Sequence, residues 1–361
     1  MNAAWSGDAS GAEVAACLDG LTDPAVRDLA WLLFDANLLR AQPPEAPLAS
    51  PWTDAAQARA VAHWLATLDR DPAPLRAVLE RSAVTRLGRY AEILLGWFLT
   101  FGPAARLVAA NVPLRRAGRT LGECDFLVSA SDGRRLHWEL AVKCYLHIGE
   151  QTTLADFVGP NLRDRFDRKH AHLLGHQLRL TEREEFAWLG YPGPWLAQMF
   201  VKGWLFYRAG TLACDPPAID PCHARGWWVT RSEWPAFAAQ QAADGWSVLP
   251  RLTWLAPRYI AAGGLARDGA LTTAEPTAGE EDPVRRRGTF TERIALAAPV
   301  DAETSLAHLL REDEPVMVAA FATCATFVAD GASGFVERSR GFIVPDDWPA
   351  RALDFAREGR D

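Results

Sequence analysis

The sequence predicts an α/β protein whose central region runs in the order helix, three strands, helix, strand. Residues 85–100 have helical apolar spacing, and three segments of strand type follow between residues 106 and 146. Helical spacing returns at residues 162–180, and residues 198–207 form an apolar run of strand length. Because helical and strand periodicities alternate here, we expect helices packed against one sheet.

A helical region is predicted before this core. Residues 23–34 and 54–68 have helical apolar spacing, and each begins with an aspartate that can cap a helix. Prolines between residues 43 and 51 separate the two helices. Residues 1–80 are therefore expected to form an N-terminal helical region. The helix that follows it places Glu92 on its polar side.

The core itself is expected to cover residues 81–210. Its three strands are predicted at residues 106–112, 121–128 and 136–146. A tight turn at residues 131–133 joins the last two strands into a hairpin.

Beyond the core the sequence predicts an extension, a linker and a C-terminal segment. The extension covers residues 211–275, and the linker at residues 276–288 is rich in proline, glycine and charge. Residues 289–361 are expected to form an α+β segment with strands at residues 315–323 and 334–344. This segment would add to the sheet or cover its edge.

Polar residues gather on the predicted strands. Side chains alternate between the two faces of a strand, so residues 136–146 place apolar side chains on one face and Glu139 and Lys143 on the other. The preceding strand places Glu123 and Asp125 on one face. Lysine is rare in this chain, with three lysines against 35 arginines. A lysine at this position is therefore a candidate functional residue.

These side chains have the chemistry of a metal-dependent phosphodiesterase. Asp125 and Glu139 on adjacent strands can converge on one Mg²⁺ or Mn²⁺ ion, because such hard cations prefer oxygen ligands. Lys143 would orient the attacking water or balance charge on the phosphate. Glu92 would supply a further carboxylate if its helix packs over these strands. The alternative interpretation is an amphipathic hairpin with one solvated polar face.

A basic segment follows the predicted strands. Arg163, Arg165, Arg168 and Lys169 gather at a predicted helix start, where backbone donors and basic side chains favour phosphate. The interleaved aspartates give the alternative of a salt-bridged, solvated helix face. Gln177 lies later on the same predicted helix and is a candidate to face the metal site.

Charge is unevenly distributed along the chain. The net charge is −7, yet residues 81–180 carry +6, whereas residues 1–80 carry −6 and residues 181–361 carry −7. A basic segment around the candidate site suits a polyanion such as nucleic acid. Chance variation along the chain is the alternative.

Composition limits the class of protein. With 49% apolar and 23% charged residues, the chain can bury a sizeable core. The sequence shows no secretion signal and no apolar run long enough for a bilayer. Its six cysteines are scattered without a framework, which favours a reducing compartment. We expect a cytoplasmic protein without a membrane partner.

The element order over residues 84–207 resembles the PD-(D/E)XK phosphodiesterase superfamily. This resemblance implies a restriction endonuclease-like core, Mg²⁺-dependent cleavage of nucleic acid, and catalytic roles for Asp125, Glu139 and Lys143. One position departs from the superfamily pattern. Ala141 stands two residues before the lysine, where Glu, Asp or Gln is usual, and Glu139 lies one strand step further away, as in members whose carboxylate has migrated.

A longer resemblance runs through nearly the whole chain. The segments that carry it are residues 26–31, 87–92, 122–126, 138–146, 159–165, 176–178, 203–207 and 254–257. They resemble a bacterial family described as domain of unknown function 1853. This resemblance supports the fold and a nuclease-like site, and it implies no substrate.

The residues and the resemblances lead to one expected function, an Mg²⁺- or Mn²⁺-dependent nuclease that hydrolyses phosphodiester bonds of DNA or RNA. The first alternative is a non-catalytic nucleic-acid-binding or scaffold protein on a degenerate nuclease fold, which Ala141 and the acidic flanking regions favour. The second alternative is a structural partner in a complex. An exposed apolar patch on residues 289–361 would indicate that role.

Overall fold

The computed structural model describes residues 9–40, 47–149, 152–261, 289–297, 299–302, 313–324 and 334–358. Within these residues the protein is a mixed α/β structure with ten α-helices and one mostly antiparallel sheet of ten strands. The α/β class predicted from the sequence is confirmed. The linker predicted at residues 276–288 lies outside the described residues.

The N-terminal region is helical, as predicted. Its helices, together with the helix that carries Glu92, are α1 (Ala9–Asp19), α2 (Pro24–Phe34), α3 (Ala55–Arg70), α4 (Ala73–Arg81) and α5 (Leu87–Phe101). Asp23 and Asp54 cap α2 and α3, because their side chains accept hydrogen bonds from backbone amides in the first turn.

The predicted order of helix, three strands, helix and strand is present after α4. Strands β1 (Arg106–Arg116), β2 (Arg119–Ser129) and β3 (Arg135–His147) follow α5 and pair antiparallel. A two-residue strand β4 (Phe157–Val158) also pairs with β3. Helix α6 (Phe166–Gly175) then leads to β5 (Leu196–Arg208), which pairs in parallel with β3.

The single helix predicted at residues 162–180 is wrong at both ends. Before α6, residues 159–165 form a loop, in which the Gly159 amide donates to the Asp164 carbonyl. After α6, His176 leaves the helical conformation with φ −130° and ψ −62°. The 3₁₀ helix η2 (Gln177–Glu182) and the short helix α7 (Glu184–Ala187) follow. Gln177 therefore begins a separate element.

The rest of the chain extends the same sheet. From β5 the strand order continues through β6 (Ala224–Thr230), β10 (Gly334–Val344), β9 (Val316–Cys324) and β7 (Gly245–Val248), and β8 (Tyr259–Ala261) pairs with β10. The remaining helical elements are η1 (Leu154–Asp156), α8 (Trp234–Ala239), η3 (Arg251–Thr253), α9 (Phe290–Ile294) and α10 (Trp348–Arg357). The C-terminal segment thus adds two strands to the sheet.

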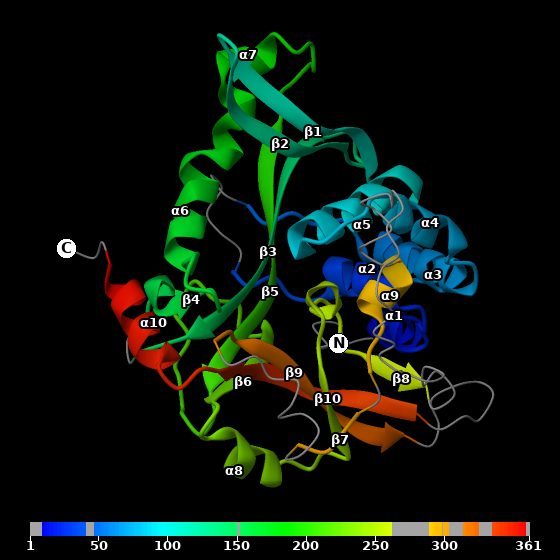
Figure 1. Ribbon diagram of the computed structural model, residues 1–361. Coiled ribbons are helices and arrows are strands. Elements are labelled where there is room, and N and C mark those ends of the chain that lie inside the picture. Colours follow the sequence, from blue (N-terminus) through cyan, green and yellow to red (C-terminus); the bar gives the residue numbers. More distant parts are fainter. Residues whose placement is uncertain are drawn as a thin grey trace, which may run out of the picture.

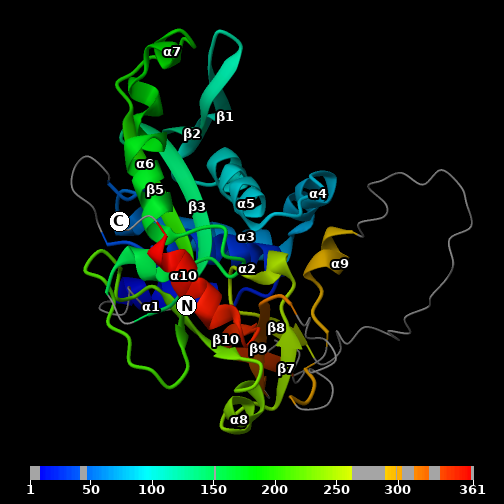
Figure 2. The ribbon, with the colours of Figure 1, turned by 60° about the vertical axis from the view of Figure 1, so that its left-hand side comes forward.

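Strand β3 is buried on both faces. Leu136 and Trp138 belong to a core shared with α2–α5, whereas Ala141 and Tyr145 pack with Phe166 of α6 in a second core. Figures 1 and 2 show α5 and α6 on opposite sides of β3 and β5. The polar face predicted for β3 is therefore covered by protein, which disfavours the solvated-hairpin alternative.

Candidate active site

Strands β2 and β3 pair over about a third of their length and then separate. Their ladder runs from Ser129↔Arg135 to Phe126↔Trp138 and ends there. Beyond that point β2 continues to Arg119 in a hairpin with β1, which Figure 1 shows leaving the sheet. We call this point the fork. A fork leaves backbone amides without ladder partners, and buried amides need other acceptors.

Asp125 and Glu139 lie at the fork and supply those acceptors. The Asp125 amide donates to Glu139 Oε1 at 3.3 Å, and the Leu140 amide donates to Asp125 Oδ2 at 2.9 Å. The two carboxylates take the place of ladder hydrogen bonds. The structure therefore brings together the two acidic residues that strand alternation had singled out.

Glu139 is fully buried and has a partner for each oxygen. Its Oε1 also contacts His137 Nε2 at 2.7 Å, and its Oε2 accepts from Gln177 Nε2 at 2.6 Å. Gln177 in turn accepts from Lys169 Nζ at 2.7 Å. Elements η2 and α6 thus bring a polar network onto the carboxylate from one side of the sheet.

The fork is electrostatically unfavourable to two negative charges. Burial, followed by the charge of Glu139, raises the pKa of Asp125 to about 8. Burial raises the pKa of Glu139 to about 7. Burial lowers the pKa of His137 to about 4, so its ring is neutral at neutral pH. The fork can therefore gain or lose protons near neutral pH and favours a nearby cation.

Glu92 lies close enough to this pair for its charge to help raise the pKa of Asp125. Its side chain is 27% exposed and is held by Arg89 Nη1 at 2.7 Å. The same Arg89 nitrogen donates to Asn111 Oδ1 of β1 at 3.0 Å. These contacts join α5 to the β1–β2 hairpin beside the fork.

No group of three or more His, Cys, Asp or Glu side chains is arranged to hold a metal ion in the part of the chain that the structure describes. Asp125 and Glu139 instead form a two-carboxylate set at the fork. Mg²⁺ usually keeps several waters and binds through one or two carboxylates together with substrate phosphates. The donor set therefore fits such an ion.

Lys143 lies on the same strand as Glu139 and has a fixed partner. Its Nζ forms an ion pair with Asp164, which also accepts from Tyr145 Oη at 3.1 Å. The Lys143 and Asp164 side chains are 31% and 33% exposed. The sequence indicated Asp164 only as one of several charges on a solvated helix face. Its position instead follows from the loop at residues 159–165.

The basic segment divides between two roles. Arg165 is buried, and its guanidinium donates to the Glu358 carbonyl at 2.6 Å, where Arg168 also donates at 3.0 Å. Both arginines therefore cap the C-terminus of α10. Arg165 is buried in this role, whereas Arg168 remains exposed, and its contact with phosphate stays a prediction. Arg163 is exposed, and Lys169 joins the fork through its hydrogen bond to a glutamine.

Two further positions are explained by their surroundings. Glu123 is exposed and lies opposite Pro113 on the part of the hairpin beyond the fork. Ala141 is buried in the apolar core that contains Tyr145 and Phe166. A carboxylate at position 141 would be surrounded by apolar side chains, whereas Glu139 reaches the fork.

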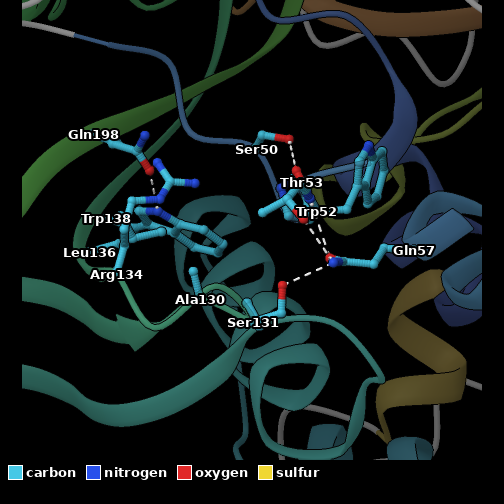
Figure 3. A pocket seen from close by; sticks show the side chains of 12 residues that line it. Ser50, Trp52, Thr53, Gln57, Ala130, Ser131, Arg134, Leu136, Trp138 and Gln198 are labelled. Carbon is cyan, nitrogen blue, oxygen red and sulfur yellow. Dashed lines mark hydrogen bonds between the residues drawn. The ribbon is translucent and has the colours of Figure 1, made fainter. Parts of the chain in front are cut away.

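A cavity of about 300 Å³ lies near the start of β3, and Lys143 is not part of its lining (Figure 3). Trp138 and Gln198 line it and are joined by a hydrogen bond of 2.8 Å. On another wall Gln57 donates to Ser131 at 2.9 Å. A second cavity of about 810 Å³ lies at the ends of β3 and β5 and contains His147 in its lining.

The fold and the fork define a mixed α/β protein with a buried carboxylate pair where two strands of its sheet separate. In the described part of the chain, no helix has the length and apolar character needed to cross a membrane. A family model described as "Domain of unknown function (DUF1853)" matches residues 27–344, and the chain belongs to this family. The comparisons with curated proteins and with solved structures found no match.

Proposed function

We propose that the protein is a metal-dependent nuclease and that α5, β1–β3, α6 and β5 form a PD-(D/E)XK core. The observation that carries this proposal is the contact between Asp125 and Glu139 at the fork, with Lys143 on the same strand. The order of these elements supports it, because β5 pairs in parallel with β3 after the α6 crossover. The superfamily resemblance rests on this order and these residues.

Asp125 and Glu139 would hold one Mg²⁺ or Mn²⁺ ion, which when bound neutralises charge on a phosphate and lowers the pKa of a bound water. Gln177 fixes one oxygen of Glu139, so the carboxylate keeps one orientation. Asp164, which also accepts from the Tyr145 hydroxyl, holds the Lys143 ammonium in place. An ammonium fixed in this way can orient a water and balance negative charge on the phosphate.

A second candidate function is non-catalytic binding of nucleic acid. It is favoured by the pairing of two charged side chains, because Lys143 is engaged by Asp164 and Glu92 is engaged by Arg89. A site with paired charges can persist for structural reasons after cleavage is lost.

A cleavage assay distinguishes the two. The wild type, Asp125→Asn, Lys143→Met and the control Glu123→Gln would be incubated with linear DNA, circular DNA and RNA in Mn²⁺ or Mg²⁺. The proposal predicts cleavage by the wild type and Glu123→Gln, loss in the other two variants, and complete inhibition by EDTA. Nucleic-acid binding by the wild type without cleavage of any substrate would support the second candidate instead.

A further inference from the structure

The β1–β2 hairpin extends well beyond the fork. Its strands stay paired as far as Arg116↔Arg119, and Ala117 and Gly118 form the turn with φ values of 46° and 77°. Figures 1 and 2 both show this end projecting from the sheet. Arg119 lies six positions before Asp125 in the chain, and at ~3.3 Å per residue this part of β2 spans ~20 Å.

One face of the hairpin is packed against the helical elements that follow α6. Val112 and Cys124 share a core with Leu180 of η2 and Phe186 of α7. At Gly122 the packing is so close that an added Cβ would lie 2.7 Å from Leu180 Cδ2. Because η2 also carries the glutamine that contacts Glu139, the hairpin has a fixed position relative to the fork.

The tip of the hairpin carries three exposed arginines, Arg115, Arg116 and Arg119. Arg116 is neutralised by α7, where it forms an ion pair with Glu185 and lies 3.9 Å from Glu184. Within the described residues, neither Arg115 nor Arg119 has an ion-pair partner. The hairpin therefore presents two guanidinium groups without an ion-pair partner in the described part of the chain, and guanidinium groups bind phosphates through paired N–H donors.

We propose that the hairpin is a substrate-binding arm, in which Arg115 and Arg119 hold the phosphodiester backbone of a nucleic acid ~20 Å from the fork. At ~3.4 Å per base pair, this distance corresponds to about six base pairs of a duplex. The location of the cleaved bond rests on the proposed nuclease function, whereas the backbone contact does not. The arm then acts only on substrates that extend this far to one side of the cleaved bond.

The backbone contact is tested by binding in EDTA, where no cleavage occurs. Labelled duplex DNA, single-stranded DNA and RNA of about 30 nucleotides would be titrated with wild type, the double variant Arg115→Ala/Arg119→Ala and the control Arg116→Ala at several salt concentrations. For B-DNA, losing two phosphate contacts makes the negative slope of log K against log salt less steep by about 1.8. We expect this change and weaker binding in the double variant only. Comparison of DNA with RNA shows which backbone the arm prefers.

Equal affinity and equal salt slope for wild type and double variant on all three nucleic acids would overturn the proposal, as would no binding by the wild type. Circular dichroism and thermal unfolding of the double variant check that it remains folded. A different result would show that only the nuclease proposal fails: the salt slope would still depend on the two arginines, but no substrate would be cleaved in Mn²⁺. If cleavage occurs, the double variant should slow it only on substrates that reach past about six base pairs.

Discussion

The two carboxylates at the fork repel each other when both are charged. The pKa of Asp125 rises from 3.8 to about 8, and that of Glu139 from 4.5 to about 7. An acid whose pKa is raised by folding binds more protons when folded than when unfolded between its two pKa values. The protonated acid therefore contributes to the free energy of unfolding. This contribution is complete below about pH 4 and is lost as the pH rises through 7 to 8.

Removing one of these charges should stabilise the protein in alkaline solution. Asn at position 125 can still accept from the Leu140 amide but carries no charge, so Asp125→Asn should raise the free energy of unfolding by at least ~2 kcal/mol at pH 8.5. The gain should shrink toward zero near pH 4. Urea unfolding in EDTA at several pH values measures this, with the exposed Glu123→Gln as control. If Asp125→Asn were less stable than wild type at pH 8.5, the Asp125 carboxylate would not be unfavourable in the folded protein.

Asp164 contacts Lys143, and its side chain remains one-third exposed. Asp164→Asn should change the free energy of unfolding by less than ~1 kcal/mol, since partly exposed ion pairs contribute little. It should nevertheless slow cleavage by about ten- to hundredfold, because the ammonium loses its fixed position. The matched control is Asp167→Asn, whose carboxylate pairs with Arg165 instead. Full cleavage by Asp164→Asn would exclude the positioning role.

Residue types and strand alternation were enough to predict that Asp125 and Glu139 lie together, because a strand fixes which face each side chain occupies. The contact of Asp164 with Lys143 could not be predicted in this way. It depends on the loop at residues 159–165, which turns back through the hydrogen bond from Gly159 to Asp164. A contact between a strand and a later loop has no periodic signal in the sequence.

The backbone of β5 leaves no room for a side chain where it pairs with β3 beside the lysine. Gly203 lies opposite Lys143 in the parallel register and has φ 142°. A Cβ added there would lie 1.7 Å from the Lys143 carbonyl oxygen. The backbone at this point therefore admits glycine alone, and the position of Lys143 depends on it.

The corresponding prediction is that Gly203→Ala destabilises the protein by more than ~3 kcal/mol, because the strands must move apart at the site. Gly210→Ala is the matched control, since Gly210 also has a positive φ, 76°, but nothing lies within 4 Å of its added Cβ. The control should lose only about 1 kcal/mol. Urea unfolding of both variants measures the difference. Equal losses would show that the close approach to β3 does not matter.

Periodicity located the elements of the core better than it located their ends. The long strands β3 and β5 and the helix α5 have strong apolar patterns, and each was predicted within a few residues. The break at His176 was missed, because the apolar positions on either side continue the same spacing while the backbone changes. That break is what turns Gln177 toward Glu139.

For the whole molecule, the sequence predicted most strands of the sheet but not their order. The last strand, β10, lies between β6 and β9, parallel to the first and antiparallel to the second. The pairing of β10 with β6 joins residues more than 100 positions apart, such as Trp227 and Gly341. Strand patterns in one sequence carry no information on which distant partner each strand takes, so the ten-stranded sheet emerged only from the structure.

We propose that the carboxylate pair at the fork is a metal site, and calorimetric titration with Mn²⁺ tests this without knowledge of the substrate. At pH 8.5 we expect the wild type and Glu123→Gln to bind Mn²⁺ and Asp125→Asn to lose this binding, because one of the two carboxylate ligands is gone. Equal binding by Asp125→Asn, or no binding by the wild type even with nucleic acid present, would show that the carboxylate pair is not a metal site.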